Sequence, residues 1–247
     1  MNTVASRWSL SRRRLFVGGF TLLELLVVIG LIAALSFFLV SGLTGGGATA
    51  ALQSAQATIA NLATTARTKA QATGRKTRLL VNSDAGATER YLRHLVLQLA
   101  RQAGPSPAEW DTLATVTLPE GVYVMPESLT HARGLVTNPK DWKRVSDPAA
   151  DLVSDLFTNQ SLSVQLEGDV AAQSWTGVGF TSNATLAALG GGQPPKGALV
   201  ITLGVRRPPG SYQPGESPVQ LGNPQAVRGL ILSAYGVPAL VGDRSSF

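Results

Sequence analysis

The feature that most constrains this chain is an apolar run over residues 20–43, "FTLLELLVVIGLIAALSFFLVSGL", in which Glu24 is the only charge. As a helix this run would be about 36 Å long, enough to cross a bilayer hydrocarbon core of about 30 Å. Arginines precede the run, and no Lys or Arg follows it until Arg67. The positive-inside rule therefore predicts a cytoplasmic N-terminus, a membrane-spanning helix and an exported remainder.

Glu24 is the residue that a plain anchor does not explain, because a charge at a bilayer centre costs roughly 2.5–3.5 kcal/mol on insertion scales. A secretory signal has an apolar core of about 7–15 residues, and this run is longer. A twin-arginine export signal is a further alternative, since "SRRRLF" at 11–16 and "ATA" at 48–50 fit its outline. An export signal and an uncleaved anchor both leave the carboxylate without a role.

The residues around Glu24 provide a third interpretation. A basic leader containing Arg12, Arg13 and Arg14 is followed by Gly19-Phe20-Thr21-Leu22-Leu23-Glu24 and then by the apolar run. This order resembles the prepilin processing motif of type IV pilins and type II secretion pseudopilins. The resemblance implies that a prepilin peptidase/methyltransferase cleaves between Gly19 and Phe20 and methylates the new N-terminal Phe20.

Cleavage at this position would give Glu24 a partner. Phe20 would acquire a cationic amine, one helical turn from Glu24 on the same face. A neighbouring subunit shifted along the helix axis could then place its Phe20 amine beside this Glu24 in a low-dielectric environment, where the two charges attract strongly. Phe20 and Glu24 are therefore the predicted subunit-assembly contact, which processing creates.

Helical periodicity resumes after a glycine-rich stretch. Gly42 and the triplet at 45–47 favour a kink or a linker, since each glycine costs about 1 kcal/mol relative to alanine in a helix. An apolar stripe then follows steps of three and four residues: Leu52, Ala55, Ile59, Leu62, Ala66 and Ala70. Residues 61–81, "NLATTARTKAQATGRKTRLLV", resemble the helix-to-strand passage of the minor pseudopilin group represented by GspH and FimT.

The rest of the chain is typical of a turn-rich β domain, because most of the 26 Gly and 14 Pro lie after residue 100. Residues 90–101 are compatible with a strand or a short helix, 119–121 ("PEG") predict a turn, and 138–157 predict a loop followed by one or two helical turns. The expected strands are 78–81, 115–118, 122–125, 162–166, 178–181, 198–205 and 229–234.

These patterns predict an α+β, pilin-like fold. A long N-terminal helix, membrane-spanning in its first half and amphipathic in its second, would pack on a C-terminal antiparallel β-rich domain. The predicted segments are a leader (1–19), a transmembrane and assembly helix (20–43), an amphipathic helix after the glycine break (44–76) and a periplasmic globular domain (77–247).

No residue pattern indicates catalysis, a cofactor or a metal. The chain has no cysteine, and its two histidines, His94 and His131, have no ligand-like neighbours. The Gly-rich segment at 190–197 lacks the order of a phosphate-binding loop. Aspartates at 147, 151 and 155 have helical spacing, which is more typical of a solvated helix face than of a calcium loop. We therefore expect a protein that is not an enzyme.

One basic cluster is compatible with nucleic acid. Lys140, Lys143 and Arg144 surround Trp142, and cations beside an aromatic ring can bind single-stranded DNA by phosphate contact and base stacking. The alternative is a loop tryptophan that covers the domain. Four of the 21 basic residues lie in the leader, which leaves 17 against 15 acidic residues, so nucleic acid is an improbable partner.

Together these features predict a structural minor pseudopilin in a type II secretion or type IV pilus-like filament that supports protein export. The alternative is a minor pilin of a DNA-uptake pilus. The expected partners are the peptidase, other pilin or pseudopilin subunits, an inner-membrane assembly platform and membrane lipid. The expected location is the bacterial inner membrane, with a single pass and a periplasmic C-terminal domain, and later a filament.

Overall fold

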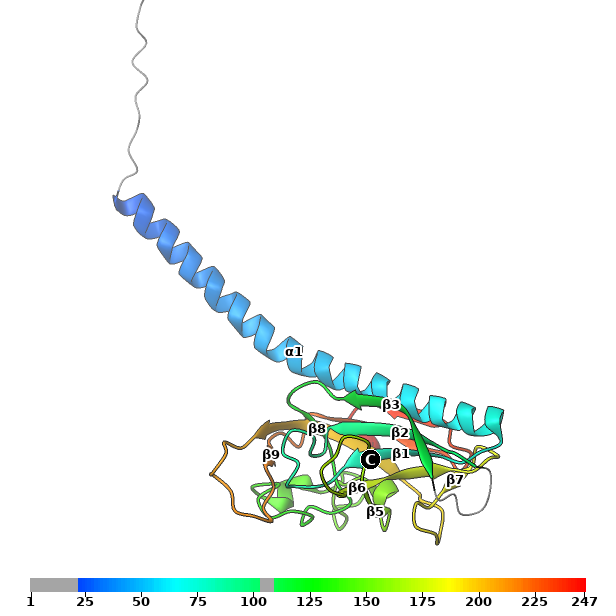
Figure 1. Cartoon of the computed structure of the whole chain (residues 1–247). Coiled ribbons are helices and arrows are strands. Elements are labelled where there is room, and N and C mark those ends of the chain that lie inside the picture. The colour runs from blue at the N-terminus through cyan, green and yellow to red at the C-terminus, as the bar shows by residue number, and fades with distance from the viewer. Residues whose placement is uncertain (1–21, 103–108) are drawn as a thin grey trace, which may run out of the picture. The chain divides into compact units, whose positions relative to one another are not determined.

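The computed structural model describes residues 22–102 and 109–247, leaving out the side chains of 23, 24, 30 and 32–46. The chain divides into two compact units, Met1–Gly45 and Gly46–Phe247. Helix α1 (Leu22–Thr73) begins in the first unit, and its second part belongs to the second unit together with every described strand (Figure 1).

The second unit contains two antiparallel sheets. The six-stranded sheet has the order β3-β2-β1-β6-β5, and β7 also pairs with β6. Its strands are β1 (Thr77–Asn82), β2 (His94–Ala100), β3 (Trp110–Thr117), β5 (Ser161–Val164), β6 (Gln173–Phe180) and β7 (Leu186–Ala187). Strand β1 therefore lies inside the sheet, with β2 on one side and β6 on the other.

The five-stranded sheet has the order β11-β10-β8-β4, and β9 also pairs with β8. Its strands are β4 (Val122–Val124), β8 (Ala198–Arg206), β9 (Val219–Leu221), β10 (Val227–Leu232) and β11 (Pro238–Val241). Three short 3-10 helices occur in the connections and at the C-terminus: η1 (Pro139–Trp142), η2 (Asp155–Phe157) and η3 (Arg244–Ser246).

The second part of α1 packs against both sheets. All six residues of the predicted apolar stripe are buried, and they belong to one core cluster with side chains from β1, β2, β6, β8 and β10. Alanines at 55, 63, 66 and 70 have no exposed surface. Small side chains at these positions allow the helix backbone to approach the sheets closely, so one helix face completes the core of both sheets.

The predicted fold class is wrong. The described structure is mostly antiparallel β-sheet, and α1 is its one α-helix. Over residues 47–73, where every side chain is described, α1 is amphipathic and does not correspond to a long apolar N-terminal helix, because Thr, Gln, Lys and Arg fill the positions between its stripe residues. Helix-to-sheet packing on one face needs only the stripe to be apolar.

The predicted membrane assignment is wrong as well. Within the two described ranges, no helix combines the length and the hydrophobicity required to cross a membrane. This finding overturns the transmembrane helix, the single-pass inner-membrane location with a periplasmic domain, and the description of the chain as an inner-membrane pseudopilin.

The glycine triplet at 45–47 does not end the helix. Helix α1 is continuous from Leu22 to Thr73 and includes all three glycines. It ends where Gly74 adopts a φ of 65°, a left-handed conformation that glycine reaches without steric cost.

The strand pattern agrees with the sequence in most places. Residues 90–101, compatible with a strand or a short helix, form β2, and the expected strands at 78–81, 198–205 and 229–234 correspond to β1, β8 and β10. The short strands β7, β9 and β11 were not predicted from the sequence. The predicted turn at 119–121 is present, with the backbone N–H of Val122 donating to the carbonyl oxygen of Pro119 (3.1 Å), and it connects β3 in one sheet to β4 in the other.

A buried glutamine ties α1 to the edge of the five-stranded sheet. Gln56 Nε2 donates hydrogen bonds to the carbonyl oxygens of Gly229 (2.6 Å) and Val241 (2.7 Å). Gln56→Met would keep the length of the side chain and remove both donors. We expect a loss of about 2 kcal/mol in the free energy of unfolding, because two buried carbonyls lose their partners.

Urea unfolding of the full chain measures this effect. Gln53→Met, on an exposed position of the same helix, is the matched control and should change the free energy of unfolding by less than about 0.5 kcal/mol. Equal effects of the two substitutions would contradict the role given to Gln56.

Candidate functional site

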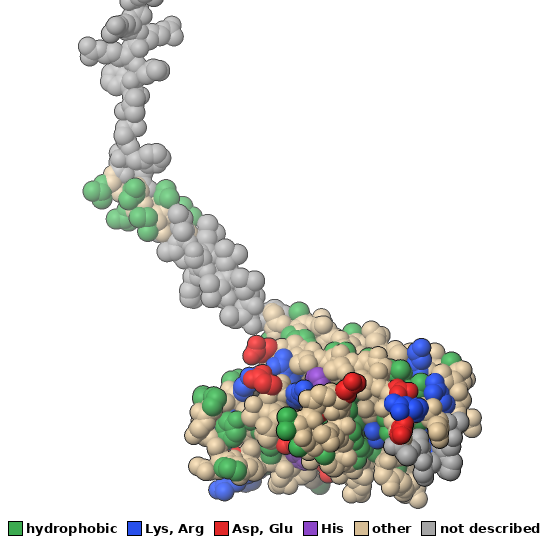
Figure 2. Space-filling model, in the orientation of Figure 1, with side chains coloured by type: hydrophobic (Ala, Val, Ile, Leu, Met, Phe, Trp, Pro, Cys, Tyr) green, Lys and Arg blue, Asp and Glu red, His purple; other side chains and the backbone are tan. Residues whose placement is uncertain are grey.

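The first described residues of α1 expose an apolar surface, which we call the apolar segment (residues 22–31). Every side chain described in this range is large, apolar and exposed, with between 46% and 82% of its surface accessible (Figure 2). These side chains are Leu22, Leu25, Leu26, Val27, Val28, Ile29 and Leu31. In water such a surface is unfavourable, at about 25 cal/mol for each Å² of apolar area left exposed.

The apolar segment has no polar face among its described side chains. Residues 25–29 are consecutive, and successive residues of an α-helix are rotated by about 100°, so these five side chains cover the whole circumference. A helix that packs against one surface needs only one apolar stripe, whereas one that is apolar all round is normally surrounded by other elements. The described side chains of the segment are therefore those expected of a helix that is surrounded by several other elements.

The residues of the processing motif lie at the start of this segment. Glu24 is the third residue of α1, and its side chain is not described. Gly19 and Phe20, together with the leader arginines Arg12, Arg13 and Arg14, lie outside the described residues. The cleavage junction and the assembly contact therefore remain predictions from the sequence.

The basic cluster around Trp142 has a structural role in the second unit. Trp142 ends η1 and is only 2% exposed, because its side chain packs in a core cluster with residues of β4, β8 and the loops. Asn138 caps η1, with its side-chain oxygen accepting a hydrogen bond from the backbone N–H of Lys140 (3.2 Å). The ring of Trp142 is thus not available for stacking with a base.

The two cations that follow Trp142 have carboxylate partners. Lys143 Nζ lies 2.7 Å from an oxygen of Asp151, and Arg144 Nη2 lies 2.5 Å from an oxygen of Asp155. The aspartates at 147, 151 and 155 do not share a helix, since only Asp155 belongs to a helical turn, η2. The fold of the loop instead places Asp151 and Asp155 beside the two cations.

These contacts support the interpretation of Trp142 as a residue that covers the domain. Of the basic cluster, Lys140 is exposed, while Lys143 and Arg144 are half-buried in their ion pairs. A DNA-contact surface would need the ring and the charges to be free, and in this cluster the ring is buried and two of the three cations are paired.

The two histidines make hydrogen-bond contacts with oxygen atoms of the second unit. His94 Nδ1 is 3.0 Å from the hydroxyl of Thr117, and His131 Nε2 is 3.4 Å from the carbonyl oxygen of Ser83. Burial and the nearby Arg90 lower the pKa of His94. Within residues 22–102 and 109–247, no group of three His, Asp or Glu side chains is arranged to hold a metal ion.

One contact between an arginine and a tryptophan was not predicted from the sequence. Arg78 and Trp110 are 32 positions apart in the chain, and the guanidinium carbon of Arg78 lies 4.0 Å from the centre of the Trp110 ring. Nothing local in the sequence marks this pair, because it depends on the register of β1, β2 and β3. The only available signal was the presence of an arginine inside an otherwise apolar strand.

Comparison with known proteins gave no match. The chain matches no protein-family model, no curated protein and no solved structure.

Proposed function

We propose that this chain is a structural subunit of a pilin-like filament, processed between Gly19 and Phe20 and assembled through the N-terminal part of α1. The observation that carries the proposal is the apolar segment, whose described side chains are exposed in all directions around the helix and whose first residues, 22–24, are the last residues of the predicted processing motif. The filament would support the export of other proteins, as the resemblance of its motif implies.

The apolar segment needs neighbours on all of its sides, which supports a filament more than an isolated dimer. A dimer interface covers one side of a helix, whereas the described side chains of residues 25–29 point in all directions around it. Equivalent helices from several neighbouring subunits would cover all sides, as in the core of a helical bundle. The occupants are therefore other copies of this chain or subunits with the same kind of N-terminal helix.

The second unit supplies a stable body for such a subunit. Its two sheets and the second part of α1 share one core cluster, so the helix is held by packing over residues 52–70. A folded body of this kind supports a structural role for the chain.

Processing is the first testable consequence. In cells that contain a prepilin peptidase, we expect loss of residues 1–19 and addition of one methyl group to Phe20, which intact-mass measurement detects. Gly19→Val should block cleavage, because a branched side chain would replace glycine at the junction that the peptidase is expected to require. The unprocessed chain should then predominate.

Gly18→Val is the matched control, since it introduces the same side chain one position earlier and leaves Gly19 in place. It should be cleaved. A mature N-terminus at Met1 or after Ala50 in the unsubstituted chain would overturn the proposed processing.

A further inference from the structure

Arg78 is held in a fixed position on the six-stranded sheet. It lies on β1, opposite Gln98 of β2 and Gly179 of β6. Its Nε donates a hydrogen bond to the side-chain oxygen of Gln98 (2.7 Å), and its guanidinium group stacks over the ring of Trp110 on β3. Two neighbouring strands therefore orient this one guanidinium group.

Gln98, which accepts the hydrogen bond from Arg78, is itself held in position. Gln98 Nε2 donates a hydrogen bond to the hydroxyl of Thr112 (3.3 Å), so its amide oxygen faces Arg78. The Nε edge and one face of the guanidinium group are thus engaged. The two Nη groups provide the remaining donors, in the fork geometry that matches two oxygens of one anion.

The charge of Arg78 has no carboxylate partner among the described residues. The acidic residues on either side of Trp110, Glu109 and Asp111, both pair with Arg101 instead. Burial lowers the pKa of Arg78 to about 10, with no opposing contribution from an anion. A half-buried cation without an anion is unfavourable in the free protein, and binding an anion would relieve this cost.

A cavity of about 360 Å³ opens beside Arg78. Arg78 and Trp110 line it, together with Gly179, Phe180 and residues 187–191 from β7 and the following loop, and with Lys76 and Thr77. No described residue in this lining is acidic. The volume lies in the lower range of small-ligand sites, which is about 300–1,000 Å³.

We propose that this cavity binds a small oxyanion, a carboxylate or phosphate group, with Arg78 as its fixed counter-ion. Gly179 allows β6 to approach β7 closely beside the cavity, because a Cβ on Gly179 would lie 3.1 Å from the carbonyl oxygen of Ala187, whereas a Cβ on Gly190 would have no atom within 4 Å. The site lies entirely in the second unit and is independent of the proposed filament function.

The test measures binding of two probes to the full chain, inorganic phosphate and N-acetylglycine, by isothermal titration calorimetry at low ionic strength. At least one probe should bind with a dissociation constant in the range of about 0.1–5 mM. Arg78→Gln should weaken binding at least about tenfold, because hydrogen bonds from a charged donor are lost.

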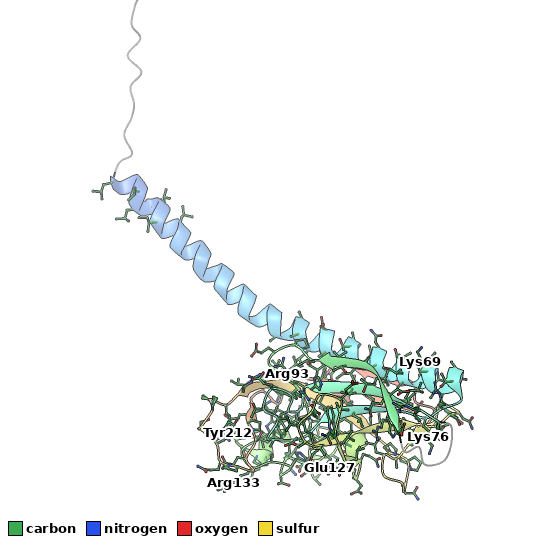
Figure 3. All side chains as sticks on the ribbon, viewed as in Figure 1. Lys69, Lys76, Arg93, Glu127, Arg133 and Tyr212 are labelled. Carbon is green, nitrogen blue, oxygen red and sulfur yellow. The ribbon has the colours of Figure 1, made fainter. Side chains whose placement is uncertain are left out.

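Arg133→Gln is the matched control for charge. Arg133 is exposed, and Figure 3 shows it at the other end of the second unit from Lys76, which lines the cavity. This substitution should leave the dissociation constant within about twofold of that of the unsubstituted chain, since Arg133 does not line the cavity and its charge is paired with Glu216.

A second pair of variants tests the cavity without changing any residue of the sheet. Gly190→Glu would place a carboxylate at the open rim, where it could pair with Arg78 and compete with the probe, whereas Gly190→Gln adds a side chain of the same size without charge. We expect Gly190→Glu to abolish measurable binding and Gly190→Gln to retain it.

The two probes distinguish the source of the oxyanion. Binding of phosphate alone assigns the site to phosphate groups, and binding of N-acetylglycine assigns it to carboxylates. The proposal is overturned if neither probe binds at about 20 mM, or if Arg78→Gln binds as tightly as the unsubstituted chain.

Discussion

Glu24→Val is expected to abolish assembly of the proposed filament while leaving cleavage after Gly19 intact. The scissile junction and the leader are unchanged, so processing should continue. In the assembled state the Phe20 amine of a neighbouring subunit would enter a low-dielectric environment without its partner. Breaking such a buried pair typically costs about 3–5 kcal/mol, which corresponds to a loss of assembly of more than a hundredfold.

Chemical crosslinking in cells that express the partner subunits measures this result, with intact mass as the check on processing. Glu167→Val is the matched control, because Glu167 is an exposed carboxylate in the second unit. It should leave the crosslinked species unchanged. Wild-type amounts of crosslinked species in Glu24→Val would show that Glu24 is not the assembly contact.

Gly177→Ala is expected to produce the largest loss of stability among single-methyl additions in the six-stranded sheet. Gly177 lies on β6 opposite Leu80 of β1, and a Cβ there would lie 2.1 Å from the carbonyl oxygen of Leu79 and 2.9 Å from the Cα of Leu80. Backbone atoms cannot rotate away, so β1 and β6 must separate locally. We expect a loss of about 3 kcal/mol in the free energy of unfolding.

Gly222→Ala is the control for this substitution, because a Cβ at Gly222 has no atom within 4 Å. Urea unfolding should show a change of less than about 0.5 kcal/mol for the control. A loss below about 1 kcal/mol in Gly177→Ala would mean that β1 and β6 tolerate a wider separation than the structure indicates.

Local sequence patterns were sufficient to predict the elements in which apolar residues recur with a strong periodicity. The stripe from Leu52 to Ala70 predicted which face of α1 is buried, since a period of 3.6 residues has one structural solution. The apolar runs at 78–81 and 198–205 predicted β1 and β8. The apolar run at 20–43 was assigned to a membrane, which the described structure does not support.

Pairings between distant strands could not be predicted from local patterns. The turn at 119–121 is local, but whether β3 and β4 pair depends on which sheet receives each strand, and they belong to different sheets. Trp142 was equally compatible with an exposed ring and a buried one. Its burial follows from the core between the five-stranded sheet and the loops, which the residues near Trp142 do not encode.

The sequence by itself determined the buried stripe of α1, because the stripe depends on residues close together in the chain. The processing motif is equally local, and it stays a prediction. Only the tertiary structure decided the two-sheet arrangement, the ion pairs of Lys143 and Arg144, and the meeting of Arg78 with Trp110 beside a cavity. The ion pairs depend on how the loop between β4 and β5 folds back on itself. The meeting of Arg78 with Trp110 depends on strand register, because a shift of one residue would move Arg78 to the opposite face of the sheet.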